Sequence, residues 1–89
     1  MSTSSELYEV RIPDFEIPKA RLCLTAWIVG SGSMVESGDP LCEICAEDIL
    51  VEIVARHGGV FHCAAVEVDD ELTTGTVIGT IELEFEGEN

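Results

Sequence analysis

Basic side chains are scarce in this chain of 89 residues. Four Lys and Arg residues stand against eighteen Asp and Glu residues, which gives a net charge of −14 at pH 7. A chain with this charge is repelled by nucleic-acid phosphates and by anionic lipid surfaces, so we expect it to bind neither. No apolar run approaches the roughly 20 residues of a membrane-spanning helix. Residues 1–6 lack the basic start and apolar centre of a secretory signal, which predicts a cytoplasmic protein.

A sustained helical period is also missing. Short β-prone runs are instead separated by turn signals about every eight to twelve residues, which predicts an all-β sandwich or barrel. The predicted strands cover residues 7–12, 22–29, 35–44 with a turn at 38–40, 50–53, 60–68 and 77–84. The 46% of apolar residues suffice for one core. We therefore expect a single domain over residues 7–84, with short tails at 1–6 and 85–89.

The segment 43–53 reads as a β-hairpin. Ile44 and Cys45 belong to the incoming strand and Leu50 to the outgoing one. Between them, Glu47 and Asp48 are the pair whose polar side chains a tight turn would place in water. The sequence thus predicts that Asp48 lies at an exposed tip on a rigid support.

A weak internal repeat indicates how two halves of the chain pack. Four apolar or glycine residues recur at an offset of 37 positions: Val35 and Leu72, Gly38 and Gly75, Leu41 and Ile78, Ile44 and Ile81. Two similar halves, each unable to bury its apolar face alone, would pack most simply about a pseudo-two-fold axis. The hairpin after Ile44 would then occupy a place equivalent to that of the chain end after Ile81.

The four cysteines, Cys23, Cys42, Cys45 and Cys63, each lie within an apolar strand-like run. In a reducing cytoplasm this is typical of small buried side chains. Cys42 and Cys45 form a C-x-x-C pair, but residues three apart on a regular strand point to opposite faces. A zinc site completed by His57 and His62 would therefore need a bulge or turn, so we expect no metal.

Catalytic residues are not expected either. Two pairs of adjacent carboxylates, Glu47-Asp48 and Asp69-Asp70, lie in predicted turns, where their side chains would point into water and not into a pocket. No Ser, Cys or Asp stands at a spacing that suggests a triad with either histidine. The segment 30–32 is followed by a strand rather than a helix, which argues against a phosphate-binding loop.

Residues spread over about positions 8–82 resemble the lipoyl domain of 2-oxo acid dehydrogenase acyltransferases. The resemblance rests on Ile12-Pro13-Asp14, Trp27, Gly32, Val35-Glu36-Ser37-Gly38-Asp39-Pro40-Leu41, Glu43-Ile44, Val51-Glu52-Ile53, Ala55, Gly59-Val60, Gly75, Val77-Ile78 and Ile81-Glu82. It implies a flattened β-barrel or sandwich of two four-stranded sheets with pseudo-two-fold symmetry. The internal repeat favours the same arrangement independently.

The resemblance fails at the attachment position. Lipoyl domains present Asp-Lys-Ala at the hairpin tip, and lipoic acid is joined to the lysine amine; here the matching residues are Glu47, Asp48 and Ile49. The related biotinyl domains carry Ala-Met-Lys-Met, of which Ala46 and an apolar Ile49 are kept. A carboxylate cannot form the amide. We therefore expect no lipoyl or biotinyl cofactor on the tip formed by Ala46, Glu47, Asp48 and Ile49.

A contact surface is predicted around the tip. Leaving both Ile49 and Leu50 exposed would forgo roughly 3–5 kcal/mol of burial, which a partner or a second copy could recover. Alternatively, the local twist turns Leu50 inward and only Ile49 is exposed. In lipoyl domains the loop matching residues 15–21 lies beside the hairpin and helps partner enzymes recognise it. The predicted contact residues are Asp48, Ile49, Leu50, Glu16 and Lys19.

Three functions are consistent with the sequence. The favoured one is a protein-interaction module without a prosthetic group, whose partners would be components of a 2-oxo acid dehydrogenase complex or a second copy in a homodimer. The second is an acyl or lipoyl carrier modified at Lys19, the only lysine. The third is a cysteine-based metal or redox protein. Because no Pro/Ala-rich linker follows Glu82, we expect a free-standing protein rather than a domain of an acyltransferase.

Overall fold

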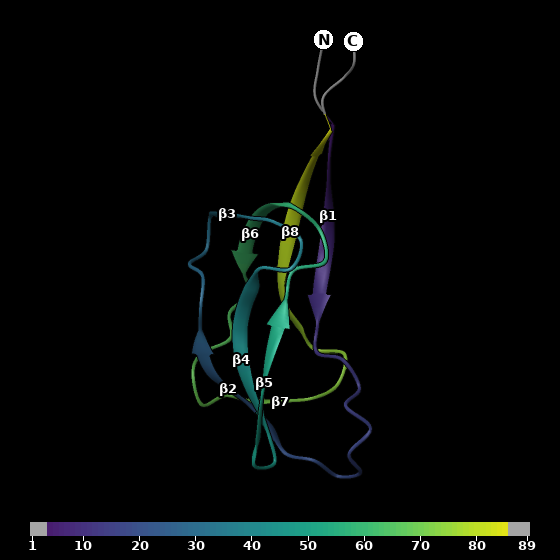
Figure 1. The fold of residues 1–89 in the computed structure, drawn as a ribbon, viewed down its shortest axis with the longest axis vertical. Helices are drawn as coiled ribbons and strands as arrows, with labels where there is room; N and C mark the ends of the chain where they lie inside the picture. Colours follow the sequence, from purple (N-terminus) through teal and green to yellow (C-terminus); the bar gives the residue numbers. More distant parts are fainter. Residues whose placement is uncertain (1–3, 86–89) are drawn as a thin grey trace.

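The computed structural model describes residues 4–85, which form two four-stranded sheets (Figure 1). The strands are β1 (Ser4–Arg11), β2 (Leu22–Trp27), β3 (Ser33–Val35), β4 (Pro40–Ala46), β5 (Ile49–Val54), β6 (Gly59–Cys63), β7 (Glu71–Leu72) and β8 (Val77–Phe85). One sheet has the order β1-β8-β6-β3 and the other β5-β4-β2-β7, with antiparallel neighbours throughout. This confirms the all-β class. Over residues 4–85 no helix is long and apolar enough to cross a membrane.

The strand pairing repeats from one sheet to the other at the 37-residue offset. Leu24 pairs with Ile44 across β2 and β4, and Phe61 pairs with Ile81 across β6 and β8. Each residue of the second pair lies 37 positions after its counterpart in the first. The two sheets are therefore related by a pseudo-two-fold axis, as the internal repeat predicted.

The backbone hydrogen bonds at the turns follow the same symmetry. The N–H of Asp39 donates to the carbonyl of Glu36 at 3.0 Å, and 37 positions later the N–H of Thr76 donates to that of Thr73 at 3.1 Å. Gly38 and Gly75 lie inside these two turns with φ of 97° and 89°. Glycine adopts such positive φ values without steric cost, which explains why both turns contain it.

The core lies between the inner faces of the two sheets. Leu24, Ile44, Phe61 and Ile81, the four residues of the symmetry-related pairs, are all fully buried. Each such side chain contributes about 1.5–3 kcal/mol relative to its exposed state. Because inward and outward residues alternate along each strand, this core also fixes which side chains the outer faces present.

The predicted strand over residues 60–68 is wrong beyond Cys63. After β6 the chain crosses to the other sheet, where the N–H of Asp69 donates to the carbonyl of Leu24 at 2.7 Å. On the way, the carbonyl of Val66 accepts a hydrogen bond from Trp27 Nε1 at 3.0 Å. Val66 packs against the core in this crossover, whereas Val68 is exposed, and strand propensity alone does not distinguish such a crossover from a strand.

Other element bounds differ by a few residues. Strand β1 begins at Ser4, so residues 4–6 pair with β8 instead of belonging to the predicted tail. The rest of that tail, residues 1–3, and residues 86–89 of the second tail lie outside the described part of the chain. Strand β2 ends at Trp27, because the next two N–H groups both donate to the carbonyl of Leu41. The two-residue strand β7 (Glu71–Leu72) was not predicted.

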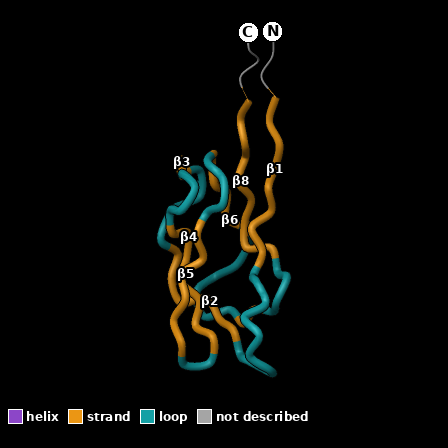
Figure 2. The backbone as a smooth tube through the Cα atoms, turned by 45° about the vertical axis from the view of Figure 1, so that its right-hand side comes forward, coloured by secondary structure: helices purple, strands orange, loops and turns teal. Residues whose placement is uncertain are grey.

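The hairpin of β4 and β5 lies at the opposite end of the molecule from the start of β1 and the end of β8 (Figures 1 and 2). Strands β1 and β8 run side by side over Ser4–Arg11, with one irregularity at Val10. The hairpin thus projects from one end of the sandwich, as the repeat implied.

Gly79 provides a test of the packing between β6 and β8. A Cβ there would lie 2.6 Å from the His62 carbonyl oxygen and 2.6 Å from the Phe61 ring. We expect Gly79→Ala to lower the free energy of unfolding by about 1–3 kcal/mol through overpacking. Gly30→Ala, whose Cβ would meet nothing closer than 3.9 Å, is the control and should change it by less than about 0.5 kcal/mol. Urea unfolding of both variants measures the difference, and equal stabilities would contradict the register.

Candidate functional site at the hairpin tip

The tip of the hairpin is a two-residue turn. Ala46 pairs with Ile49 at the ends of β4 and β5, and Glu47 and Asp48 connect them. Ala46 is buried, whereas Glu47 and Asp48 are exposed. Glu47 has a positive φ of 58°, as two-residue hairpin turns require of at least one central residue. The predicted position of Asp48 is therefore confirmed: it lies at the exposed end of a paired, partly buried ribbon.

Glu47 ties the tip to the neighbouring loop. The backbone N–H of Arg21 donates to Glu47 Oε2 at 2.6 Å, and the N–H of Glu47 donates to the Arg21 carbonyl at 2.9 Å. A carboxylate that accepts a backbone N–H forms one of the stronger types of hydrogen bond. Sequence alone predicts Glu47 as a solvated turn residue and does not predict this contact, because its partner lies 26 positions earlier in the chain.

The loop between β1 and β2 is folded against the domain. Ile17 and Phe15 are partly buried against the core, and the N–H of Glu16 donates to Asp14 Oδ1 at 2.7 Å. Glu16 and Lys19 are exposed and both have positive φ, of 61° and 57°. The loop therefore places these two predicted contact residues on the surface, in a segment whose end is fixed to the tip through Glu47.

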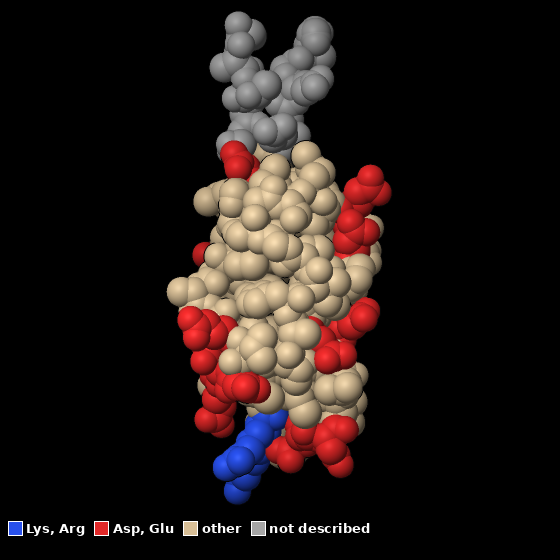
Figure 3. Space-filling model, turned by 90° about the vertical axis from the view of Figure 1, so that its left-hand side faces the viewer, with Lys and Arg blue, Asp and Glu red and all other residues tan. Residues whose placement is uncertain are grey.

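Positive charge on the face drawn in Figure 3 gathers at the end of the molecule that holds this tip. Lys19 and Arg21 are two of the four basic residues of the chain, and both belong to the loop that approaches the hairpin. Acidic side chains flank the rest of that face. The surface around the tip thus combines the Glu47 and Asp48 carboxylates with a small basic patch, within a molecule that is otherwise strongly acidic.

Both apolar side chains that follow the turn are exposed. Ile49 is 53% exposed and Leu50 61% exposed. The alternative in which Leu50 turns inward is therefore wrong. Further along β5, Ile53 is 8% exposed and belongs to the core. Ile49 and Leu50 thus expose apolar side chains next to Asp48, one on each face of the hairpin, because consecutive residues of a strand point to opposite sides.

The cysteine and histidine side chains are distributed over different parts of the fold. Cys42 points into the core, where burial, followed by the nearby Cys63 thiol, raises its pKa to about 12. Cys45 lies on the outer face, so the C-x-x-C pair is divided between the two faces as predicted. The ring of His57 packs against that of Tyr8, with centroids 4.5 Å apart.

His62 Nε2 lies 3.3 Å from Glu82 Oε1, on the sheet that does not contain the tip. The structure thus does not bring Cys42, Cys45, His57 and His62 together. Within residues 4–85, no group of three or more His, Cys, Asp and Glu side chains could hold a metal ion.

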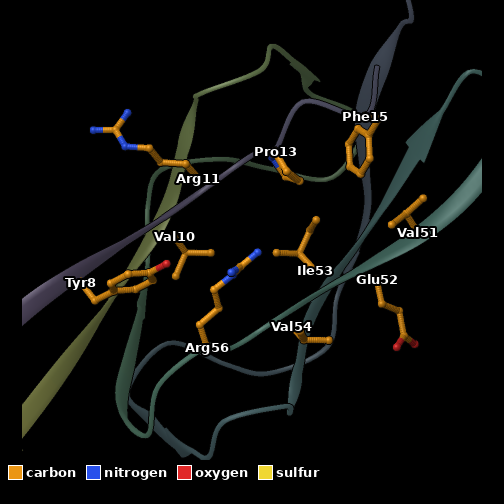
Figure 4. A pocket seen from close by; sticks show the side chains of 10 residues that line it. All are labelled: Tyr8, Val10, Arg11, Pro13, Phe15, Val51, Glu52, Ile53, Val54 and Arg56. Atoms are coloured by element: carbon orange, nitrogen blue, oxygen red, sulfur yellow. The ribbon is translucent and has the colours of Figure 1, made fainter. Parts of the chain in front are cut away.

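A pocket of about 180 Å³ lies between the edge strands β1 and β5 (Figure 4). Arg56 extends between Val10 and Ile53, with Tyr8 at one side, whereas the guanidinium of Arg11 points away. Small-molecule sites typically have volumes of about 300–1,000 Å³. This pocket is smaller than that, and we assign no substrate to it.

Two antiparallel four-stranded sheets related by a pseudo-two-fold axis, with one projecting hairpin, form a barrel-sandwich fold of the kind found in biotinyl and lipoyl domains. The family model for biotin- and lipoyl-carrying domains, described as "Biotin-requiring enzyme", matches residues 9–81. The chain belongs to this family. No solved structure gives a significant match to it.

A curated relative is the dihydrolipoyllysine-residue succinyltransferase component of the 2-oxoglutarate dehydrogenase complex of Bacillus subtilis (strain 168). It is 28% identical over 73 residues, which cover 82% of this chain. The match covers only 18% of the succinyltransferase. The chain therefore spans less than one fifth of the length of that protein.

The side chains at this tip do not fit an amide-linked prosthetic group. An amide link to lipoate or biotin requires a primary amine, and residues 46–49 offer a methyl group, two carboxylates and an aliphatic chain. The only primary amine of a lysine in the chain is that of Lys19, in the neighbouring loop.

Removal of the Glu47 carboxylate should release the loop. In Glu47→Ala the Arg21 N–H loses its acceptor, which we expect to cost about 1 kcal/mol and to accelerate exchange of that amide about fivefold. Glu47→Gln keeps an acceptor oxygen and should restore most of the protection. Hydrogen exchange followed by NMR measures this, with Asp48→Ala as the control at the adjacent position. Equal exchange in Glu47→Ala and the parent protein would refute the contact.

Proposed function

We propose that this chain is a lipoyl-type domain that carries no lipoyl or biotinyl group and acts as a protein-binding module. The observation that carries the proposal is Asp48, a carboxylate at the exposed tip where lipoyl domains present a lysine. A carboxylate is not an acceptor for amide formation with another carboxylic acid. The module accordingly has no reaction of its own at this position.

The contact surface comprises the tip and the adjoining loop. Ile49 and Leu50 supply exposed apolar area, and Asp48, Glu16 and Lys19 supply charge around it. An apolar centre with a polar border is the usual composition of a protein-binding patch. Glu47 supports the arrangement by holding the end of the loop against the turn.

The proposed partners are components of a 2-oxo acid dehydrogenase complex. The similarity to a succinyltransferase component of such a complex supports this choice. Because the chain spans only 18% of that relative, its transferase activity is not carried over. We propose a cytoplasmic location, in keeping with the composition of the chain.

Intact mass spectrometry after co-expression with a lipoate ligase or a biotin ligase tests the absence of a prosthetic group. We expect the mass of the parent protein to remain unchanged, because its tip has no amine. Asp48→Lys should gain one lipoyl or biotinyl group, since it restores the acceptor at the turn. A gain of mass by the parent protein that Lys19→Arg abolishes would identify the loop lysine as a displaced attachment site and overturn the proposal.

Binding to the purified dehydrogenase component of a 2-oxo acid dehydrogenase complex tests the contact surface. Leu50→Ser should weaken binding about tenfold to a hundredfold, because burial of a leucine in an interface contributes about 1.5–3 kcal/mol. Met34→Ser is the matched control: Met34 is 70% exposed but belongs to the other sheet. Biolayer interferometry on the full chain measures both.

An equal loss of affinity in the two variants would contradict the assignment of the surface, as would a lack of binding by the parent protein. Sedimentation equilibrium of the same proteins measures self-association. A dimer that Leu50→Ser dissociates would show that a second copy, instead of a dehydrogenase component, covers the tip.

A further inference from the structure

Two of the four cysteines lie opposite each other on neighbouring strands. Cys23 of β2 pairs directly with Cys45 of β4 in the antiparallel register. Leu24 and Ile44, the next residues along these strands, are fully buried, whereas both cysteines are half-buried. Because successive side chains on a strand point to opposite faces, both thiols project from the outer face of the sheet.

The backbone geometry brings these two residues within reach of a disulfide bond. The N–H of Leu24 donates to the Asp70 carbonyl at 3.1 Å, on the β7 side, so the amide of Cys23 faces β4. Cys23 and Cys45 are therefore a hydrogen-bonded pair, in which the Cα atoms lie about 5.5 Å apart. Disulfides span Cα distances of about 4.4–6.8 Å, which includes this value.

The same geometry predicts that the oxidised form is strained. Directly opposed Cβ atoms on antiparallel strands lie about 4.5–5.5 Å apart, whereas a disulfide holds them about 3.5–4.5 Å apart. Bond formation must therefore draw β2 and β4 together by about 1 Å. Strained and accessible disulfides are readily reduced. Such bonds form and break reversibly and do not serve as permanent structural links.

The pair lies next to the hairpin tip, because Cys45 directly precedes Ala46 at the end of β4. Leu50 and Glu71 flank Cys45 and Cys23 in the same row across the sheet. The thiol of Cys45 donates to the carbonyl of Glu47, with Sγ and O 2.8 Å apart. Burial, followed by the Cys23 thiol and the Asp48 and Glu47 carboxylates, raises the pKa of Cys45, so its thiolate is scarce at neutral pH. Thiol–disulfide exchange at Cys45 is therefore slow at neutral pH, because only the thiolate attacks a disulfide.

We propose that Cys23 and Cys45 form a reversible dithiol–disulfide pair that exchanges with linear disulfides of small thiol compounds. One cysteine thiolate attacks a sulfur of the small disulfide and releases the first small thiol, which leaves a mixed disulfide on the protein. The second cysteine then attacks the protein sulfur and releases the second small thiol. Two protein thiols lose two electrons and two protons, and one disulfide is reduced to two thiols.

This activity is independent of the binding function proposed above. It uses the thiols of Cys23 and Cys45, which lie beside Leu50 of the contact surface, and it requires neither a prosthetic group nor a dehydrogenase component. The chain also supplies a control, because Cys63 is a half-buried cysteine on the other sheet, where its N–H donates to Ser31 Oγ at 2.9 Å.

The experiment uses the full reduced chain and glutathione disulfide at mildly alkaline pH, without denaturant. We expect the intact mass to fall by two hydrogen atoms, two of the four thiols to escape alkylation when the oxidised chain is afterwards unfolded, and a peptide map to link Cys23 to Cys45. A small dithiol should reverse the change. Cys63→Ser should behave as the parent chain does, whereas Cys23→Ser and Cys45→Ser should each lose the internal disulfide and retain a glutathione adduct instead.

Three results would overturn the proposal. The first is that all four thiols remain free unless the chain is denatured. The second is a link that involves Cys42 or Cys63. The third is a mixed disulfide that never closes in the folded parent chain. Urea unfolding of each variant verifies that it is folded. If one of the two variants, at Cys23 or at Cys45, does not fold, the other still tests the proposal.

Discussion

The packing of two equivalent strand pairs against each other determines the rest of this structure. Leu24 and Ile44 in one sheet face the same core as Phe61 and Ile81 in the other, and all four are fully buried. Neither half could bury these side chains alone, so the two halves stabilise each other through one shared core. A one-residue slip in either sheet would turn its apolar residues toward water, and for this reason the register is strongly fixed.

A fixed register has a direct consequence for the hairpin tip. The pairing of β4 with β5 continues to Ala46 and Ile49, so that the turn of Glu47 and Asp48 is held at the end of a fully paired hairpin. Glu47 also fixes the end of the loop between β1 and β2, because its carboxylate accepts a hydrogen bond from the N–H of Arg21. The surface proposed for partner binding is therefore largely organised before any partner arrives, which lowers the entropic cost of association.

The sequence predicts features that depend on local pattern and misses those that depend on register. The polar pair Glu47 and Asp48 between two β-prone runs predicts the hairpin and its turn. The 37-residue repeat predicts the symmetry of the two sheets. The segment after Cys63 has the composition of a strand but is a crossover, because a residue such as Val66 can pack on the core without pairing in a sheet. The Arg21–Glu47 contact and the Cys23–Cys45 pair join residues 26 and 22 positions apart, and only the register of β2 and β4 brings them together.

The fold and the chemistry of the tip are energetically separate. Asp48 is exposed at the end of the hairpin, and substitutions at such positions usually change stability by no more than about 0.5 kcal/mol. The core therefore places no constraint on whether this position holds an amine or a carboxylate, and a retained fold is not evidence for a retained prosthetic group. The same separation applies to Cys23 and Cys45, whose side chains lie on the outer face while Leu24 and Ile44 beside them maintain the core. Because one layer of side chains holds the sheets together and the other is free to vary, a domain built to present a tethered group can present a binding surface and a thiol pair instead.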